Sequence, residues 1–251
     1  MWPLQVLDRM RDPASEAAPY SIVLRECGKT YYFGNIQEKT CMTRNMRENL
    51  LWILLPLLVH TGLLNLTQIY IDAAGWQTPG LSAILTNSFC ILLFGTIKLR
   101  CFRKSMVPRQ RDIRRKAVIC FLCLLLGMVL SAAAGMCMKK AGVFQIMPDD
   151  IQGELHSAPL WLQITGFCMI VPVGEELVFR VFAFDRMCIL FPAAVSAAGS
   201  ALLFALGHGS PLQSLYAFFM GLLLAGSYYE GGSAAAVLFH AGANLAAVFV
   251  R

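Results

Sequence analysis

The sequence predicts an all-α, polytopic helical membrane protein with about seven transmembrane helices. Of its 251 residues, 57% are hydrophobic and only 14% are charged, whereas soluble domains carry about 25% charged residues. No Asp, Glu, Lys or Arg occurs between Cys188 and Tyr229, a length that accommodates two crossings of about 20 residues each. These observations exclude a disordered chain and argue against an ordinary cytosolic enzyme.

The chain divides into three parts by composition. Residues 1–49 are a mixed, charged segment in which Ser21–Leu24 and Thr30–Phe33 can form a short hairpin. Residues 50–157 hold the upstream transmembrane helices, and residues 158–251 hold a core of four more, the first of them unusually long. The predicted spans are Leu50–Ile71, Leu81–Leu99, Ala117–Met138, Ala158–Leu190, Pro192–Gly207, Leu212–Tyr229 and Ser233–Val250.

The distribution of basic residues predicts the orientation. Residues 1–49 contain seven Lys and Arg, Asp72–Gly80 none, Lys98–Lys116 nine and Lys139–Ser157 two. Because cytoplasmic loops collect Lys and Arg, the N-terminus and Lys98–Lys116 are expected in the cytoplasm, and Lys139–Ser157 is expected to face the outside. The net charge of +6 therefore reflects basic residues that orient the chain in the membrane. No nucleic acid is expected as a partner. Short loops without an organelle signal favour a bacterial plasma membrane.

The fourth predicted span carries three ionisable residues, Glu175, Glu176 and Arg180. Each costs roughly 2.5–3.5 kcal/mol to insert, so such groups usually mark function. Glu176 and Arg180 are one helical turn apart and can pair. Glu175 points about 100° away around the helix and is left for another task. The alternative is a buried packing triad without chemistry, which would leave one carboxylate unpaired.

Three further polar residues lie in the least polar part of the chain. His208 follows Glu175 by 33 positions, with a natural break between two helices at Phe191-Pro192. A hairpin turning there returns His208 to the depth of Glu175. His240 and Asn244 are four residues apart and share a helix face. We therefore expect the cluster among the fourth, fifth and seventh spans.

Two kinds of chemistry fit this cluster. A carboxylate and a histidine can deprotonate one water, while a second histidine and an Asn amide donate hydrogen bonds to the oxyanion. Alternatively, Glu175 or Glu176 with His208 and His240 binds zinc, with water as the fourth ligand. Both arrangements hydrolyse peptides. The metal-free one is favoured, because Glu176 cannot readily bind a shared zinc and also pair with Arg180.

Three motifs carry a family resemblance: Glu-Glu-x-x-x-Arg at 175–180, Phe-x-x-x-His at 204–208 and His-x-x-x-Asn at 240–244. In this order they resemble the CPBP (CAAX protease and bacteriocin-processing, Abi) family of intramembrane proteases, which includes the type II CAAX prenyl endopeptidases. The resemblance covers roughly residues 158–250. It implies that Glu175 activates water with His208, that His240 and Asn244 support the oxyanion, and that Glu176, Arg180 and Phe204 are structural.

The resemblance implies an intramembrane endopeptidase, glutamate- or metal-dependent, that acts among membrane lipids on a peptide or protein, lipidated or not. Members of the family are often labelled metalloproteases. Two rival classes of function are compatible with the sequence. The first is a non-catalytic membrane protein on the same fold, an immunity protein of the bacteriocin self-immunity type or a scaffold. The second is a transporter that relays protons, against which the chain shows no internal symmetry. The complete Glu, His, His and Asn set favours the enzyme.

Overall fold

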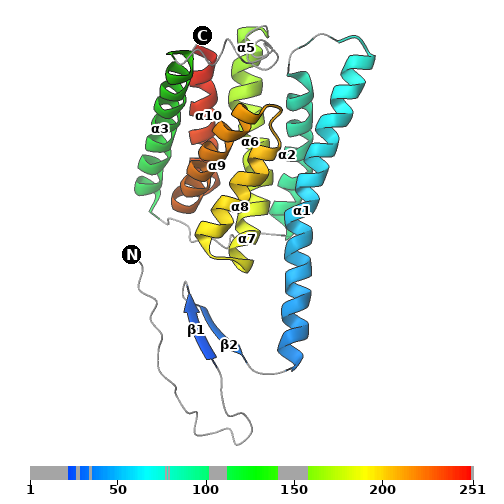
Figure 1. Cartoon of the computed structure of the whole chain (residues 1–251), viewed down its shortest axis with the longest axis vertical. Coiled ribbons are helices and arrows are strands. Elements are labelled where there is room, and N and C mark those ends of the chain that lie inside the picture. The colour runs from blue at the N-terminus through cyan, green and yellow to red at the C-terminus, as the bar shows by residue number, and fades with distance from the viewer. Residues whose placement is uncertain are drawn as a thin grey trace, which may run out of the picture. The chain divides into compact units, whose positions relative to one another are not determined.

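The computed structural model forms two compact units, Met1–Glu48 and Asn49–Arg251 (Figure 1). Within them the structure describes residues 22–26, 29–33, 36–76, 78, 80–101, 112–140 and 158–249. Most of the predicted Lys98–Lys116 and Lys139–Ser157 loops lies outside these residues. The assignment of those loops to opposite sides of the membrane therefore stays a prediction.

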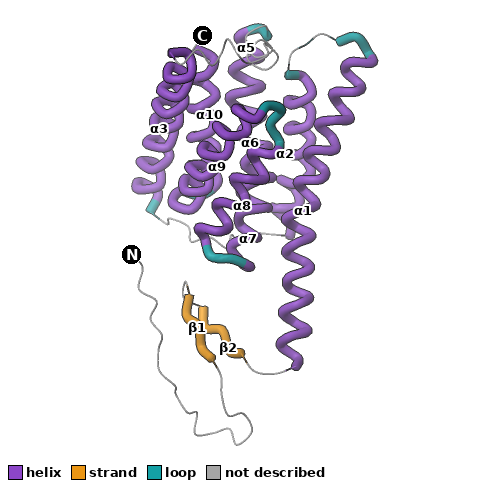
Figure 2. The backbone as a smooth tube through the Cα atoms, viewed as in Figure 1, coloured by secondary structure: helices purple, strands orange, loops and turns teal. Residues whose placement is uncertain are grey.

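The first unit contains an antiparallel hairpin of β1 (Ile22–Glu26) and β2 (Lys29–Phe33) (Figure 2). Ile22 pairs with Phe33 at one end and Glu26 with Lys29 at the other. The hairpin lies where the sequence placed it. Because it belongs to this unit, the predicted all-α class holds for the described residues of the second unit only.

Helix α1 (Ile36–Ala73) begins well before the predicted apolar span, which started at Leu50. No glycine or proline occurs between Ile36 and Leu50, so nothing in the sequence stops the helix at the edge of the apolar stretch. Charged turns such as the one that carries Arg44 and Arg47 are therefore helical as well. Hydrophobicity located the span, but it did not locate the start of the helix.

Every apolar stretch that was predicted to be a span is helical. Met46–Ala73, Leu81–Arg100 and Ile113–Lys140 are long and apolar enough to cross a membrane, whereas two other apolar helices are shorter. The count of seven crossings stays a prediction. After α1, the helices are α2 (Leu81–Cys101), α3 (Ile113–Lys140), α8 (Ala193–Leu206), α9 (Pro211–Gly231), α10 (Ser233–Phe249), and one long helix composed of α5 (Leu160–Leu162), η2 (Gln163–Ile170), α6 (Val171–Glu176), η3 (Leu177–Phe184) and α7 (Asp185–Leu190).

The long helix is widened on both sides of the turn that carries the two glutamates. In η2 and η3 the backbone has π-helical hydrogen bonding: Val171 N–H donates to the carbonyl of Gly166, and Asp185 N–H to that of Arg180. Pro172 contributes upstream, because its ring lacks an N–H and crowds the carbonyl four residues earlier. Such π segments occur frequently at functional sites.

Helices α3 and α10 lie side by side (Figure 1), and glycines let their backbones approach closely. A Cβ on Gly127 would lie 2.9 Å from the carbonyl carbon of Phe239, and one on Gly242 would lie 3.2 Å from that of Leu124. Small residues at helix contacts are the usual route to close packing in membranes. The position of α10 along α3 is thus set by contacts between the backbones of the two helices.

Aromatic side chains fill the core around η3. Phe179 packs edge-on against Phe204, with ring centroids 5.2 Å apart. Helix α1 joins this core through Trp52, 6.0 Å from Phe182, and through His60, 5.8 Å from Phe179. The residues of the predicted polar cluster therefore pack against this aromatic core.

Candidate active site

The base of the site is an ion pair within the long helix. Arg180 Nε lies 3.2 Å from Glu176 Oε2, and both side chains are completely buried. The pairing expected from their four-residue spacing is therefore present. The guanidinium carbon of Arg180 also lies 4.8 Å from the centroid of Phe204, a cation–π contact. Glu176 is thus neutralised and shielded from water.

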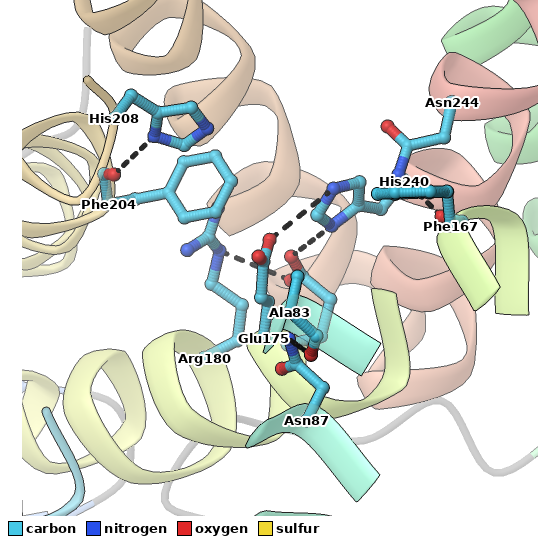
Figure 3. A network of polar contacts seen from close by, with 10 residues as sticks. Ala83, Asn87, Phe167, Glu175, Arg180, Phe204, His208, His240 and Asn244 are labelled. Carbon is cyan, nitrogen blue, oxygen red and sulfur yellow. Dashed lines mark hydrogen bonds and ion pairs between the residues drawn. The ribbon is translucent and has the colours of Figure 1, made fainter. Parts of the chain in front are cut away.

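His240 faces both glutamates, and Figure 3 shows its ring directed toward Glu175. Its Nδ1 lies 3.0 Å from Glu176 Oε1, and its Nε2 lies 3.7 Å from Glu175 Oε2. An ionised carboxylate can only accept hydrogen bonds, so the Nδ1–H of His240 donates to Glu176. This bond fixes the plane of the ring and directs Nε2 toward Glu175. The Glu175 side chain is 18% exposed, whereas that of Glu176 is completely buried.

His208 reaches the same region from the end of α8. Its Nδ1 lies 2.9 Å from the carbonyl oxygen of Phe204; because a carbonyl can only accept, Nδ1–H is the donor. The Phe204 ring packs edge-on against His208 at 4.9 Å and against His240 at 5.7 Å. The ring therefore separates the two histidines. Within the described part of the chain no hydrogen bond joins His208 to Glu175.

Asn244 lies one turn beyond His240 on α10. Its Nδ2 donates to the backbone carbonyl of Phe167, at 2.7 Å (Figure 3). An amide nitrogen carries two hydrogens, so one N–H stays available after this bond. The bond also ties α10 to η2, which places Asn244 and His240 at a defined height beside the long helix.

The zinc arrangement is not assembled. Among the described residues no group of three His, Cys, Asp or Glu side chains has the spacing that holds a metal ion. In both histidines Nδ1 donates a hydrogen bond to oxygen, which leaves Nε2 as the nitrogen that could bind a metal ion. The Phe204 ring packs between the two histidines, however, so His208 and His240 do not converge with Glu175 or Glu176 on one point, and no step below runs through a metal.

Two buried polar residues near the site were given no role by sequence reasoning. His60 on α1 is 6% exposed and packs on Phe179. Asn87 on α2 is 1% exposed and contacts the turn that carries the glutamates. The available signal was an amide inside an otherwise apolar span. It was missed because Asn87 belongs to none of the three motifs.

Comparison with protein families identifies the carboxy-terminal part. Residues 157–246 match the family described as type II CAAX prenyl endopeptidase Rce1-like. This segment is Rce1-like. The resemblance drawn from the three motifs is thereby confirmed, and the Rce1-like segment contains every residue of those motifs. A comparison with curated proteins and with solved structures gave no match. Taken with the three long apolar helices, the match supports a membrane protein whose carboxy-terminal segment is similar to a protease family.

Proposed function

We propose that the chain is an intramembrane endopeptidase in which Glu175 activates the attacking water. The observation that supports this is the contrast between two adjacent carboxylates. Glu176 is fully buried and paired with Arg180, whereas Glu175 is partly exposed and lies 3.7 Å from His240 Nε2. Two neighbouring acids in unlike environments are typical of sites that divide acid–base work between them.

In the proposed reaction, hydrolysis of the peptide bond proceeds in two steps. Glu175 accepts a proton from water while the resulting hydroxide attacks the carbonyl carbon of the scissile peptide bond. The C–N bond then breaks, and the leaving nitrogen takes the proton that Glu175 received. His240, held by Glu176, keeps Glu175 and the water aligned. The second amide hydrogen of Asn244 is free to donate to the oxyanion, and His208 is the second candidate for orienting the water.

The substrate proposed is a peptide or protein segment that enters the bilayer. The description of the matched family favours a prenylated Cys near the cleavage site. A farnesylated peptide and its unmodified counterpart are therefore the first probes. They separate recognition of the lipid from recognition of the peptide.

The test is hydrolysis of internally quenched peptides by the purified full chain in detergent, with and without a chelator. Glu175→Gln should reduce kcat on the order of 100- to 10,000-fold, as expected for loss of a general base. Glu230→Gln is the matched control, because Glu230 is an exposed carboxylate at the end of α9. A folded wild-type chain that cleaves no peptide would refute the proposal and favour the non-catalytic immunity or scaffold protein.

A further inference from the structure

Asn87 is a buried amide on α2, upstream of the Rce1-like segment. Its side chain is 1% exposed, and its Nδ2 donates to the carbonyl of Ala83 in its own helix, at 2.9 Å. Its Oδ1 has no hydrogen-bond partner among the described residues. An unmet acceptor in an apolar interior destabilises a protein, and an alanine or leucine here would avoid that cost. Stability alone therefore does not account for this residue.

The Asn87 side chain packs against Gly174. A Cβ on Gly174 would lie 2.6 Å from Asn87 Cβ and 2.8 Å from Asn87 Cγ, and it would overlap Oδ1. Gly174 immediately precedes Glu175 and Glu176, and Figure 3 shows Asn87 beside the turn that carries them. The absence of a side chain at 174 is what lets the amide touch the backbone of that turn.

We propose that Asn87 is a positioning residue, which holds the Glu175–Glu176 turn at its place against His240 by its contact with Gly174. The inference rests on the proposed function. On each side of this turn the helix is π-widened, so the turn has fewer α-helical hydrogen bonds to hold it in register. A contact from another helix supplies that restraint. Both His240 contacts, at 3.0 and 3.7 Å, depend on where the turn lies.

The test compares Asn87→Ala, Gly174→Ala and the double variant, with the farnesylated quenched peptide as probe. Each single change should lower kcat about 10- to 100-fold, as expected for a small misplacement of catalytic groups, with KM little changed. The thermal midpoint of Asn87→Ala should not fall below the wild-type value, because the unmet acceptor is removed. The double variant should be about as slow as the slower single variant, because both changes act on one contact and an alanine at position 87 keeps the Cβ that would lie 2.6 Å from a Cβ at 174.

Ser88→Ala is the matched control. Ser88 is the next residue on α2, and its hydroxyl likewise donates to a carbonyl of its own helix, that of Ile84, at 2.7 Å. It should keep wild-type kcat. Wild-type kcat in both single variants, losses that follow the thermal midpoint, or a double variant in which the two losses multiply would each overturn the positioning role.

A second measurement does not depend on turnover. Dicyclohexylcarbodiimide modifies carboxyl groups in apolar surroundings, and mass spectrometry reports the labelling rate at Glu175. That rate should change several-fold in Asn87→Ala and Gly174→Ala and stay at the wild-type value in Ser88→Ala. Unchanged labelling in both variants would overturn the inference. If the wild-type chain cleaves no peptide, the proposed function fails, while this labelling still decides on Asn87.

Discussion

Replacing Arg180 by alanine should strand a buried carboxylate. Loss of one member of a buried ion pair typically costs about 3–5 kcal/mol, and the Arg180 contact with Phe204 at 4.8 Å is lost as well. Glu176 keeps one donor, the Nδ1–H of His240 at 3.0 Å, which compensates in part. We therefore expect a loss near the lower end, about 3 kcal/mol, and a thermal midpoint lower by roughly 6–12 °C for a chain of this size.

The assay is thermal unfolding in detergent, with the double variant Glu176→Gln/Arg180→Met as control. The double change removes both charges and leaves no stranded ion, so it should restore most of the lost stability. His240 can still donate to the amide oxygen at position 176. A midpoint of Arg180→Ala equal to that of the wild type would refute the reasoning. So would a double variant as unstable as the single one.

Four further predictions concern the site, the helix packing and the orientation expected from the sequence. His240→Ala should lower kcat at least about 100-fold, since both glutamates lose their shared neighbour; full activity in the purified variant would contradict this role. Gly127→Leu should cost about 1–3 kcal/mol by forcing α3 away from α10, which unfolding in detergent measures; an unchanged midpoint would argue against the close helix contact. A chelator should leave the hydrolysis rate unchanged, whereas one tightly bound zinc per active molecule, with activity restored only by zinc, would overturn the metal-free reading. Single cysteines placed at Ser105 and Ser157 should be labelled from opposite sides of the membrane; labelling from one side would disprove the predicted orientation.

The helices were predictable because apolar stretches of this length have few alternatives in a bilayer. The residues at which the helices begin and end were harder to predict. The stop of the fourth helix at Leu190, before Pro192, follows from local chemistry, whereas the start of α1 at Ile36 does not coincide with any change in hydrophobicity. The π-helical segments also escaped prediction, because sequence periodicity assumes 3.6 residues per turn throughout.

The site was predictable where it is local. The pairing of Glu176 with Arg180 depends only on one turn of helix, so residue spacing was sufficient. The contact of His240 with both glutamates depends on how α10 packs against the long helix, and no spacing rule contains that information. The resemblance paired Glu175 with His208, whereas in the structure the closer partner of Glu175 is His240. The contribution of Asn87 required knowing which helix lies beside Gly174.

The ion pair within the long helix bears on how the protein is assembled. Glu176 has its counter-charge on its own helix, so that pair is already neutral when the segment enters the bilayer. His240 arrives separately, on α10, and meets the glutamates only after α10 has docked. The proposed protease is therefore expected to be inactive during biosynthesis until α10 has packed against the long helix.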